Sequence, residues 1–221
     1  MPNNKKHILF SLIMTLPFFP DVFYLALAVV GTSIIDFDHN LKINNLFVMT
    51  LLGILLTLIL YIFNLPVIWG LLILFLALLF FICKDRGFMH SLFGVILTGL
   101  ILTALIVGLY FLLLDFTTNK MVVMVLILAF LGFLSLNLKL VAPYIILVVV
   151  GLLLLPNLNF NVYSIFGAII LGFFSHLILD MFTPNGVQLF GPLYKRKFHK
   201  TTGLIFLVLW VALAIFYLIF R

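Results

Sequence analysis

The sequence has little charge and no glutamate: charged residues make up 8% of its 221 positions, and its acidic residues are six aspartates. A soluble globular domain carries roughly 25% charged residues, so this composition excludes an ordinary soluble enzyme. The single cysteine, Cys83, excludes an intramolecular disulfide and is expected to act as a small hydrophobe. No polar stretch is long enough to form a separate soluble domain. We therefore expect one integral-membrane domain over residues 1–221.

Apolar residues, by contrast, account for 66% of the chain, and the mean hydropathy is +1.42. They form runs at 8–20, 22–35, 45–64, 66–83, 88–114, 121–137, 140–155, 161–182 and 203–220. Several of these runs reach the roughly 20 residues that cross a bilayer core as a helix. The predicted fold class is all-α: a polytopic transmembrane helical bundle of about 8–9 hydrophobic segments.

The first two runs are short, at about 13 or 14 residues, and are separated by residues 17–21. They form either two short spans or one re-entrant hairpin, and both options return the chain to its starting side. Lys5 and Lys6 precede the first run as in a signal peptide, but no small-residue cleavage site follows. The segment is therefore expected to be retained.

Basic residues are unevenly distributed between the two sides when every run is taken to cross the membrane. Those on the N-terminal side are Lys5, Lys6, Lys42, Lys84, Arg86, Lys139, Lys195, Arg196, Lys197 and Lys200. Only Lys120 and Arg221 lie on the other side. This asymmetry predicts a multi-pass cell-membrane protein with a cytoplasmic N-terminus. Orientation in the bilayer thus explains the net charge of +6, and no nucleic-acid partner is expected because no polar domain could dock a duplex.

The same topology brings all five histidines and four of the six aspartates to the cytoplasmic side, although histidine positions were not used to draw it. The residues concerned are His7, Asp36, Asp38, His39, Asp85, His90, His176, Asp180 and His199. Imidazole nitrogens and carboxylate oxygens are ligands of zinc and similar divalent ions. The pattern predicts a metal site at this face of the membrane.

Two of the polar clusters lie between apolar runs, and each has a structural alternative. Asp38 and His39 follow the second run and either bind metal or cap a helix end. Arg86, which precedes Gly87, either binds a phosphate group or is an ordinary topology signal. His90 lies just inside the next apolar run, where a ligand role is favoured.

Within the eighth run, His176 and Asp180 are four residues apart and therefore share one face of a helix. An ionised Asp inside a span costs on the order of 3 kcal/mol, which favours a metal-ligand pair over a plain hydrogen bond. Pro184 and Gly186 then predict a helix stop. The basic stretch that follows, which contains His199, is expected to contact lipid head groups.

With these residues the chain resembles a family of membrane-bound metal-dependent hydrolases of bacteria and archaea, the YdjM-like family. The matching residues are His7, Asp36-Phe37-Asp38-His39, Arg86-Gly87-Phe88-Met89-His90-Ser91, Ser175-His176, Asp180, Thr183, Gly186 and Val187. The resemblance spans most of the chain and implies a helical membrane fold and a hydrolase activity. Two positions depart from the family pattern: Ile35 stands where the family has Pro, and Asp85 stands where it has His.

The leading hypothesis is an integral-membrane metal-dependent hydrolase that acts on phosphoesters of lipids. The metal ligands expected are His7, Asp36, Asp38, His39, His90, His176 and Asp180. Seven ligands exceed the four of a tetrahedral zinc, so one or two divalent ions, with Zn²⁺ preferred, are expected. Asp38 or Asp85 is expected to act as general base toward a water activated by the metal, and Arg86 to stabilise charge on a phosphoryl group.

Two rival functions are also compatible with the sequence. A divalent-metal transporter would hold its polar groups near the bilayer midplane between repeated halves, whereas here they lie at one interface and no internal repeat is evident. A non-catalytic scaffold would use the His and Asp contacts only to hold helices together. An open coordination position would argue against the scaffold.

Overall fold

The computed structural model describes residues 4–35, 43–83, 87–155, 159–194 and 196–220, and every regular element in these ranges is a helix. The elements are α1 (Asn4–Thr15), α2 (Val22–Ile34), α3 (Ile43–Ile62), α4 (Ile68–Ile82), the 3₁₀ turn η2 (Phe88–His90), α5 (Leu92–Leu114), α6 (Lys120–Ser135), α7 (Leu138–Leu154), α8 (Val162–Met181) and α9 (Lys200–Phe220). Each apolar run of the sequence corresponds to one α-helix. The all-α prediction is confirmed.

Three of the described helices, α5, α8 and α9, are long and apolar enough to cross a membrane. The longest apolar stretch of the other helices is 17 residues, Leu46–Ile62 in α3, and a helix of that length is about 26 Å long against a bilayer core of about 30 Å. The expectation of about 8–9 crossing segments is therefore wrong by the length of the apolar stretch in each described helix. The apolar runs overstated the helices because residues at their ends, such as Leu16 and Phe63, form turns instead.

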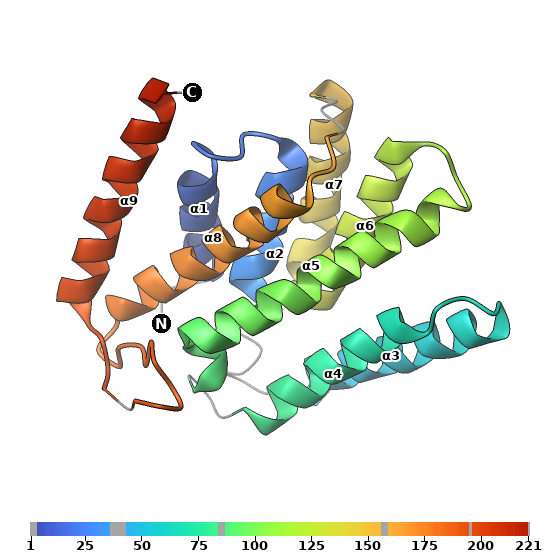
Figure 1. Cartoon of the computed structure of the whole chain (residues 1–221), viewed down its shortest axis with the longest axis horizontal. Helices are drawn as coiled ribbons and strands as arrows, with labels where there is room; N and C mark the ends of the chain where they lie inside the picture. The colour runs from blue at the N-terminus through green and yellow to red at the C-terminus, as the bar shows by residue number, and fades with distance from the viewer. Residues whose placement is uncertain (1–3, 36–42, 84–86, 156–158, 195, 221) are drawn as a thin grey trace.

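Helices α1 and α2 form a hairpin of 12 and 13 residues joined by a turn. The Ser11 hydroxyl in α1 donates a hydrogen bond of 3.1 Å to the Ala28 carbonyl oxygen in α2 and so links the two helices. Helices of 12 and 13 residues are shorter than a bilayer core of about 30 Å, which favours the re-entrant hairpin over the alternative of two short spans. Figure 1 shows the hairpin beside α8, with the N-terminal end of α1 near the last turns of α8.

Helices α2 and α8 cross with their backbones in direct contact. An added Cβ at Gly31 would lie 2.6 Å from the Ile169 carbonyl oxygen, and one at Gly172 would collide with the Ala28 carbonyl oxygen. Small residues permit this close approach, as is common where helices pack in membranes. The crossing fixes the last turns of α2 against the part of α8 that carries His176.

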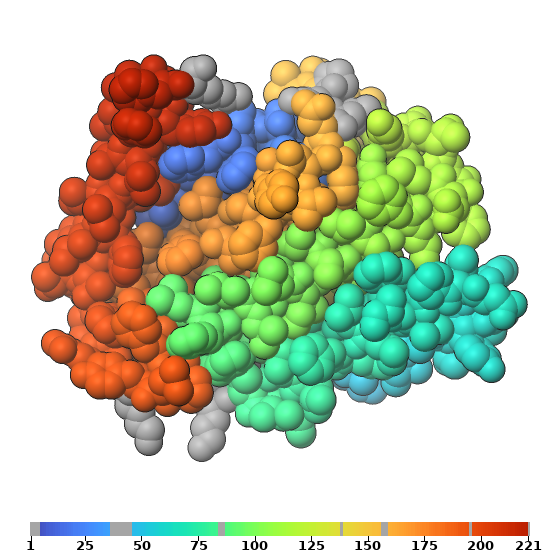
Figure 2. Space-filling view, in the orientation of Figure 1, coloured from blue at the N-terminus to red at the C-terminus, as the bar shows by residue number. Residues whose placement is uncertain are grey.

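The remaining helices surround this central pair. Helix α5 packs on α8, and the α3–α4 hairpin forms one edge of the molecule (Figure 1). Helix α9 forms the opposite edge, as Figure 2 shows, and of its residues only Gly203 and Ala214 are buried. Trp210 ties α9 to α1, because its indole N–H donates a hydrogen bond of 3.1 Å to the Met14 carbonyl oxygen. The apolar surface of α9 is thus turned outward, as expected of a helix that faces lipid.

Candidate metal centre

Four of the predicted ligands meet at one end of the bundle. His7 comes from the first turns of α1, His90 from η2, and His176 and Asp180 from the second half of α8. All four are buried, with relative exposures of 3% for His7 and 0% for the other three. Burial of three imidazoles around one carboxylate costs free energy unless the groups are compensated, which marks this cluster as a functional candidate.

The three imidazoles converge on the carboxylate of Asp180. The Nε2 atom of His7 lies 3.8 Å from Oδ1, that of His90 3.6 Å from Oδ2, and that of His176 3.7 Å from Oδ2. A direct hydrogen bond between an imidazole and a carboxylate would be about 2.7–2.9 Å long. These three contacts are therefore not direct hydrogen bonds.

The same separations suit a bound cation. One ligand atom from each of His7, His176 and Asp180 lies within 4.8 Å of the others. Zinc bonds to nitrogen and oxygen are about 2.0–2.2 Å long, so tetrahedral geometry separates two ligand atoms by roughly 3.3–3.5 Å. The observed nitrogen–oxygen distances are only slightly longer. The donor set of imidazoles and a carboxylate thus fits a divalent metal both in chemistry and in spacing.

The orientation of His176 is set by a backbone group. Its Nδ1 atom lies 2.9 Å from the Thr32 carbonyl oxygen in α2. Because a carbonyl oxygen can only accept, Nδ1 must carry the proton, and in the neutral ring Nε2 then presents a lone pair toward Asp180. A second contact of this kind is typical of metal-binding histidines. The plain hydrogen bond from His176 to Asp180, which the sequence left open, is disfavoured by both the tautomer and the distance.

The imidazole rings also pack on one another. His7 and His176 are stacked, with ring centroids 4.1 Å apart and an interplanar angle of 18°, and His90 meets His176 edge-on at 5.5 Å. The lone histidine near the start of the sequence is therefore brought next to a residue 169 positions later. This arrangement confirms that His7, His90 and His176 belong to one cluster.

His90 is held by the cap of α5. The Ser91 hydroxyl accepts a hydrogen bond of 3.1 Å from the Gly94 amide and donates one of 2.6 Å to the Phe88 carbonyl oxygen. The Phe88 carbonyl also lies where a Cβ on Gly94 would be. The segment from Gly87 to Ser91 thus forms a tight turn that ends in an N-cap, as expected for Ser at this position.

Asp180 lies at the end of α8, where the predicted helix stop is confirmed. The helix ends at Met181, and the Asp180 carbonyl oxygen accepts hydrogen bonds from the Thr183 hydroxyl at 2.7 Å and the Thr183 amide at 3.0 Å. Gly186 adopts a positive φ of 62°, which glycine tolerates best. His199 is exposed and is not part of the cluster.

Several predicted site residues lie outside the described residues. They are the candidate ligands Asp36, Asp38 and His39, and the candidate catalytic residues Asp85 and Arg86. Their roles therefore stay predictions. Sequence reasoning missed the Thr32 carbonyl, because a backbone acceptor leaves no signal in residue type.

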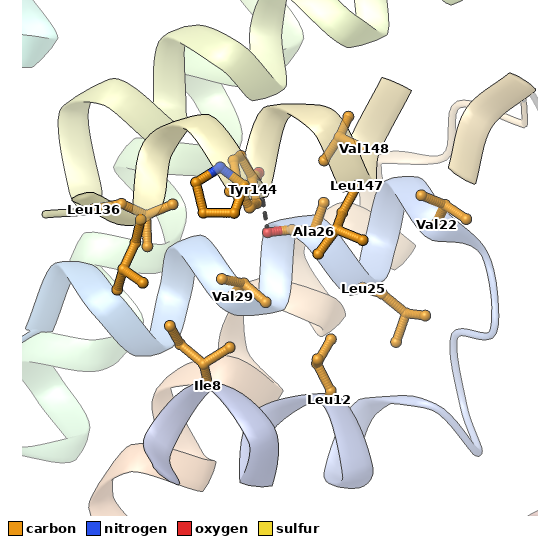
Figure 3. Close-up of a pocket in the computed structure, with 12 residues that line it drawn as sticks. Ile8, Leu12, Val22, Leu25, Ala26, Val29, Leu136, Tyr144, Leu147 and Val148 are labelled. Carbon is orange, nitrogen blue, oxygen red and sulfur yellow. Dashed lines mark hydrogen bonds between the residues drawn. The ribbon is translucent and has the colours of Figure 1, made fainter. Parts of the chain in front are cut away.

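Two apolar cavities flank α1, and none of the four cluster residues lines either of them. One of about 270 Å³ lies between α1, α2 and α7 and includes Ile8, Val29 and Tyr144 (Figure 3). The other, of about 590 Å³, lies between α1, α8 and α9 and includes Trp210. Both are lined by apolar and aromatic side chains, so chemistry is expected at the cluster rather than in either cavity.

The comparisons with known proteins agree with the motif resemblance. The model of the YdjM inner membrane protein family matches residues 3–221, which is nearly the whole chain. No curated protein and no solved structure gives a match. A match over this length, together with the convergence of His7, His90, His176 and Asp180 in space, shows that the chain belongs to the YdjM family of inner membrane proteins.

Proposed function

We propose that this chain is a multi-pass membrane hydrolase that uses a divalent metal at the cytoplasmic membrane face to cleave phosphoesters of lipids. One observation carries the proposal: three buried imidazoles converge on the Asp180 carboxylate at 3.6–3.8 Å. Distances of this size are too long for hydrogen bonds and close to those between ligands of one ion.

The metal would be held by His7, His176 and Asp180, whose ligand atoms lie within 4.8 Å of one another, and His90 would contact Asp180 from beside this group. Two nitrogen donors and one oxygen donor favour Zn²⁺ over Mg²⁺ or Ca²⁺, which prefer oxygen ligands. A divalent ion in such a site supplies Lewis acidity toward a water or a phosphoryl oxygen. Asp36, Asp38 and His39 are the further ligands that we propose, for this ion or for a second one.

The protein itself supplies orientation and a dry environment. The Thr32 carbonyl keeps the Nε2 lone pair of His176 aimed at Asp180. Burial of the four side chains excludes bulk water, so charges in the cluster interact more strongly than at the surface. Asp38 or Asp85 would take up the proton of the attacking water, and Arg86 would stabilise charge on the phosphoryl group.

The position of the cluster at helix ends supports a substrate in the membrane surface. Asp180 is one residue from the end of α8, and His90 is two residues before α5 begins. Both helices are long enough to span a bilayer, so their ends reach the depth of the lipid head groups. Lys5 and Lys6, exposed at the same end, support a cytoplasmic location.

The metal-transport alternative loses support for the same reason. A transport site is expected near the middle of broken helices, whereas His176 and Asp180 lie in the last two turns of an unbroken α8. A structural metal site remains the rival that experiment must separate from a catalytic one.

The first test is the metal content of the detergent-purified protein, compared with His176→Ala and Asp180→Ala. His199→Ala is the matched control, because this histidine is exposed and outside the cluster. We expect one or two divalent ions per chain in the wild type and the control, and loss in both cluster variants. A wild type that binds no divalent metal after reloading would refute the proposal.

The second test separates a catalytic from a structural ion. The metal-loaded protein in nanodiscs is assayed for release of phosphate or a phosphorylated head group from phospholipids and lipid phosphates. Hydrolysis that is lost with the metal supports the proposal. Stoichiometric metal without turnover of any lipid phosphoester assigns the ion a structural role.

A further inference from the structure

The segment that joins α8 to α9 is a folded loop, and its described residues, 182–194 and 196–199, form no helix. Val187 and Phe198 form an isolated antiparallel bridge, with amide-to-carbonyl distances of 3.0 Å and 2.8 Å in the two directions. This bridge closes a loop whose described residues are 188–194, 196 and 197. The positive φ of Gly186 allows the turn that leads into it.

The loop is fixed beside the His/Asp cluster. The Leu92 amide at the start of α5 donates a hydrogen bond of 2.9 Å to the Leu189 carbonyl oxygen. Val187 and Leu189 are buried, so one side of the loop belongs to the protein core. Because Leu92 follows His90 by two residues, the loop and the cluster share one end of the bundle.

The outer side of the loop exposes large apolar and aromatic side chains. Leu193 is 80% exposed, Tyr194 is 52% exposed and Phe190 is 42% exposed. A protein in water would be expected to bury such a group or to avoid it. Tyrosine and neighbouring apolar residues are, however, typical of the region where protein meets lipid head groups.

Exposed cations follow these apolar residues directly. Arg196, Lys197 and Lys200 are all exposed, and the sequence from residue 181 to 221 contains no acidic residue to balance them. Apolar side chains with adjacent basic ones match an anionic membrane surface, where the former insert and the latter contact phosphates. A soluble acidic partner would not require Leu193 and Tyr194.

We propose that the loop between α8 and α9 is an interfacial anchor that binds anionic phospholipid head groups in the leaflet next to the His/Asp cluster. Leu193 and Tyr194 insert between the head groups, while Arg196, Lys197 and Lys200 contact lipid phosphates. The anchor holds the end of α8 at a constant depth in the membrane. It does not depend on the proposed hydrolase activity, because it rests on residues outside the cluster.

The test measures the depth of the loop in the full-length chain, reconstituted in nanodiscs of zwitterionic phosphatidylcholine with or without phosphatidylglycerol. A polarity-sensitive fluorophore is attached at Leu193→Cys in a Cys83→Ser background. The matched control is Thr118→Cys, an exposed position in the turn between α5 and α6. Quenching by spin labels near the head groups and by aqueous iodide reports the position of each fluorophore.

We expect the Leu193 fluorophore to be blue-shifted and quenched by the lipid spin labels, more strongly when phosphatidylglycerol is present. The variant Arg196→Gln/Lys197→Gln/Lys200→Gln should lose this lipid dependence while its unfolding temperature stays near that of the parent. Equal access of iodide at Leu193 and Thr118 would overturn the proposal. The proposal would also be overturned if the charge variant kept the full effect of phosphatidylglycerol. The same holds if millimolar inorganic phosphate, at constant ionic strength, abolished that effect in the parent protein.

Discussion

The Nδ1 atom of His176 lies 2.9 Å from the Thr32 carbonyl oxygen, and this contact decides which ring nitrogen faces Asp180. With Nδ1 protonated, the lone pair of Nε2 faces a carboxylate oxygen of Asp180 that lies 3.7 Å away. Two electron-rich atoms facing each other in a buried site repel unless a cation or a proton lies between them. The contact between α2 and α8 thus fixes the His176 tautomer that the proposed metal site requires.

The first prediction concerns the charge of Asp180. Asp180→Asn keeps the size of the side chain but removes the negative charge on which the imidazoles converge. Disturbing a residue that only supports a metal ligand lowers metal affinity by about 10–100-fold. Asp180→Asn removes a proposed ligand itself, so we expect metal affinity to fall by at least about 100-fold. Metal titration of the purified variant checks this.

A hydrogen-bonded cluster without metal would give the opposite result. In such a cluster the amide oxygen introduced by Asp180→Asn could still accept hydrogen bonds from the imidazoles. The variant would then be as stable as the wild type, and neither protein would bind metal at the cluster. Unfolding temperatures of the two proteins, measured after chelation, serve as the control for correct folding.

The second prediction concerns the close crossing of α2 and α8. Gly172→Ala introduces a Cβ that collides with the Ala28 carbonyl oxygen, so the helices must separate. Overpacking of this kind costs about 1–3 kcal/mol of stability, and we expect metal affinity to fall with it because His176 moves away from Thr32. Thermal unfolding and metal titration give the two readouts.

Gly99→Ala is the matched control for that change. Its Cβ would meet the flexible end of the Ile170 side chain at 2.8 Å rather than a backbone atom. The side chain can move aside, so both stability and metal affinity should stay near wild type. Equal losses in the two variants would show that the effect is not specific to the α2–α8 crossing.

The sequence predicted the elements of this fold well because hydrophobic runs and helix stops are local signals. Pro184 and Gly186 follow the end of α8, where a helix stop was expected. Helix length was predicted less well, because apolar residues such as Leu16 continue a hydrophobic run into a turn. Hydropathy reports burial or lipid contact, and it does not distinguish a helical residue from an apolar residue in a turn.

The candidate site was partly predictable for a different reason. His176 and Asp180 are four residues apart, so helix periodicity alone puts them on one face. His7 and His90 are distant in sequence, and they were connected by the assumption of a common membrane side and by the family resemblance. The stacking of His7 on His176 depends on the packing of α1 against α8, which no sequence pattern specified.

The third prediction separates helix capping from site assembly. Ser91→Ala removes the N-cap of α5 and the hydrogen bond to Phe88, at a cost of about 1 kcal/mol. Because this cap also shapes the turn that holds His90, we expect metal affinity to decrease as well. Metal titration is the decisive measurement.

Asn119→Ala provides a matched comparison, since Asn119 caps α6 with hydrogen bonds to the Met121 and Val122 amides. It should lose a similar amount of stability but leave metal affinity unchanged, because α6 carries none of the four described cluster residues. If Ser91→Ala behaved like Asn119→Ala in both measurements, η2 would not be needed to position His90.

The last prediction concerns removal of the ion. A metal bound only by the folded protein stabilises it by RT ln(1 + [metal]/Kd), which is about 2.7 kcal/mol at a hundredfold excess over Kd. We therefore expect chelation to lower the unfolding temperature of the wild type in detergent, and added Zn²⁺ to restore it. Asp180→Asn should unfold at the same temperature with and without chelator, whereas His199→Ala should respond like the wild type. If chelation shifted wild type and Asp180→Asn by the same amount, the stabilising ion would have to bind somewhere other than the His/Asp cluster.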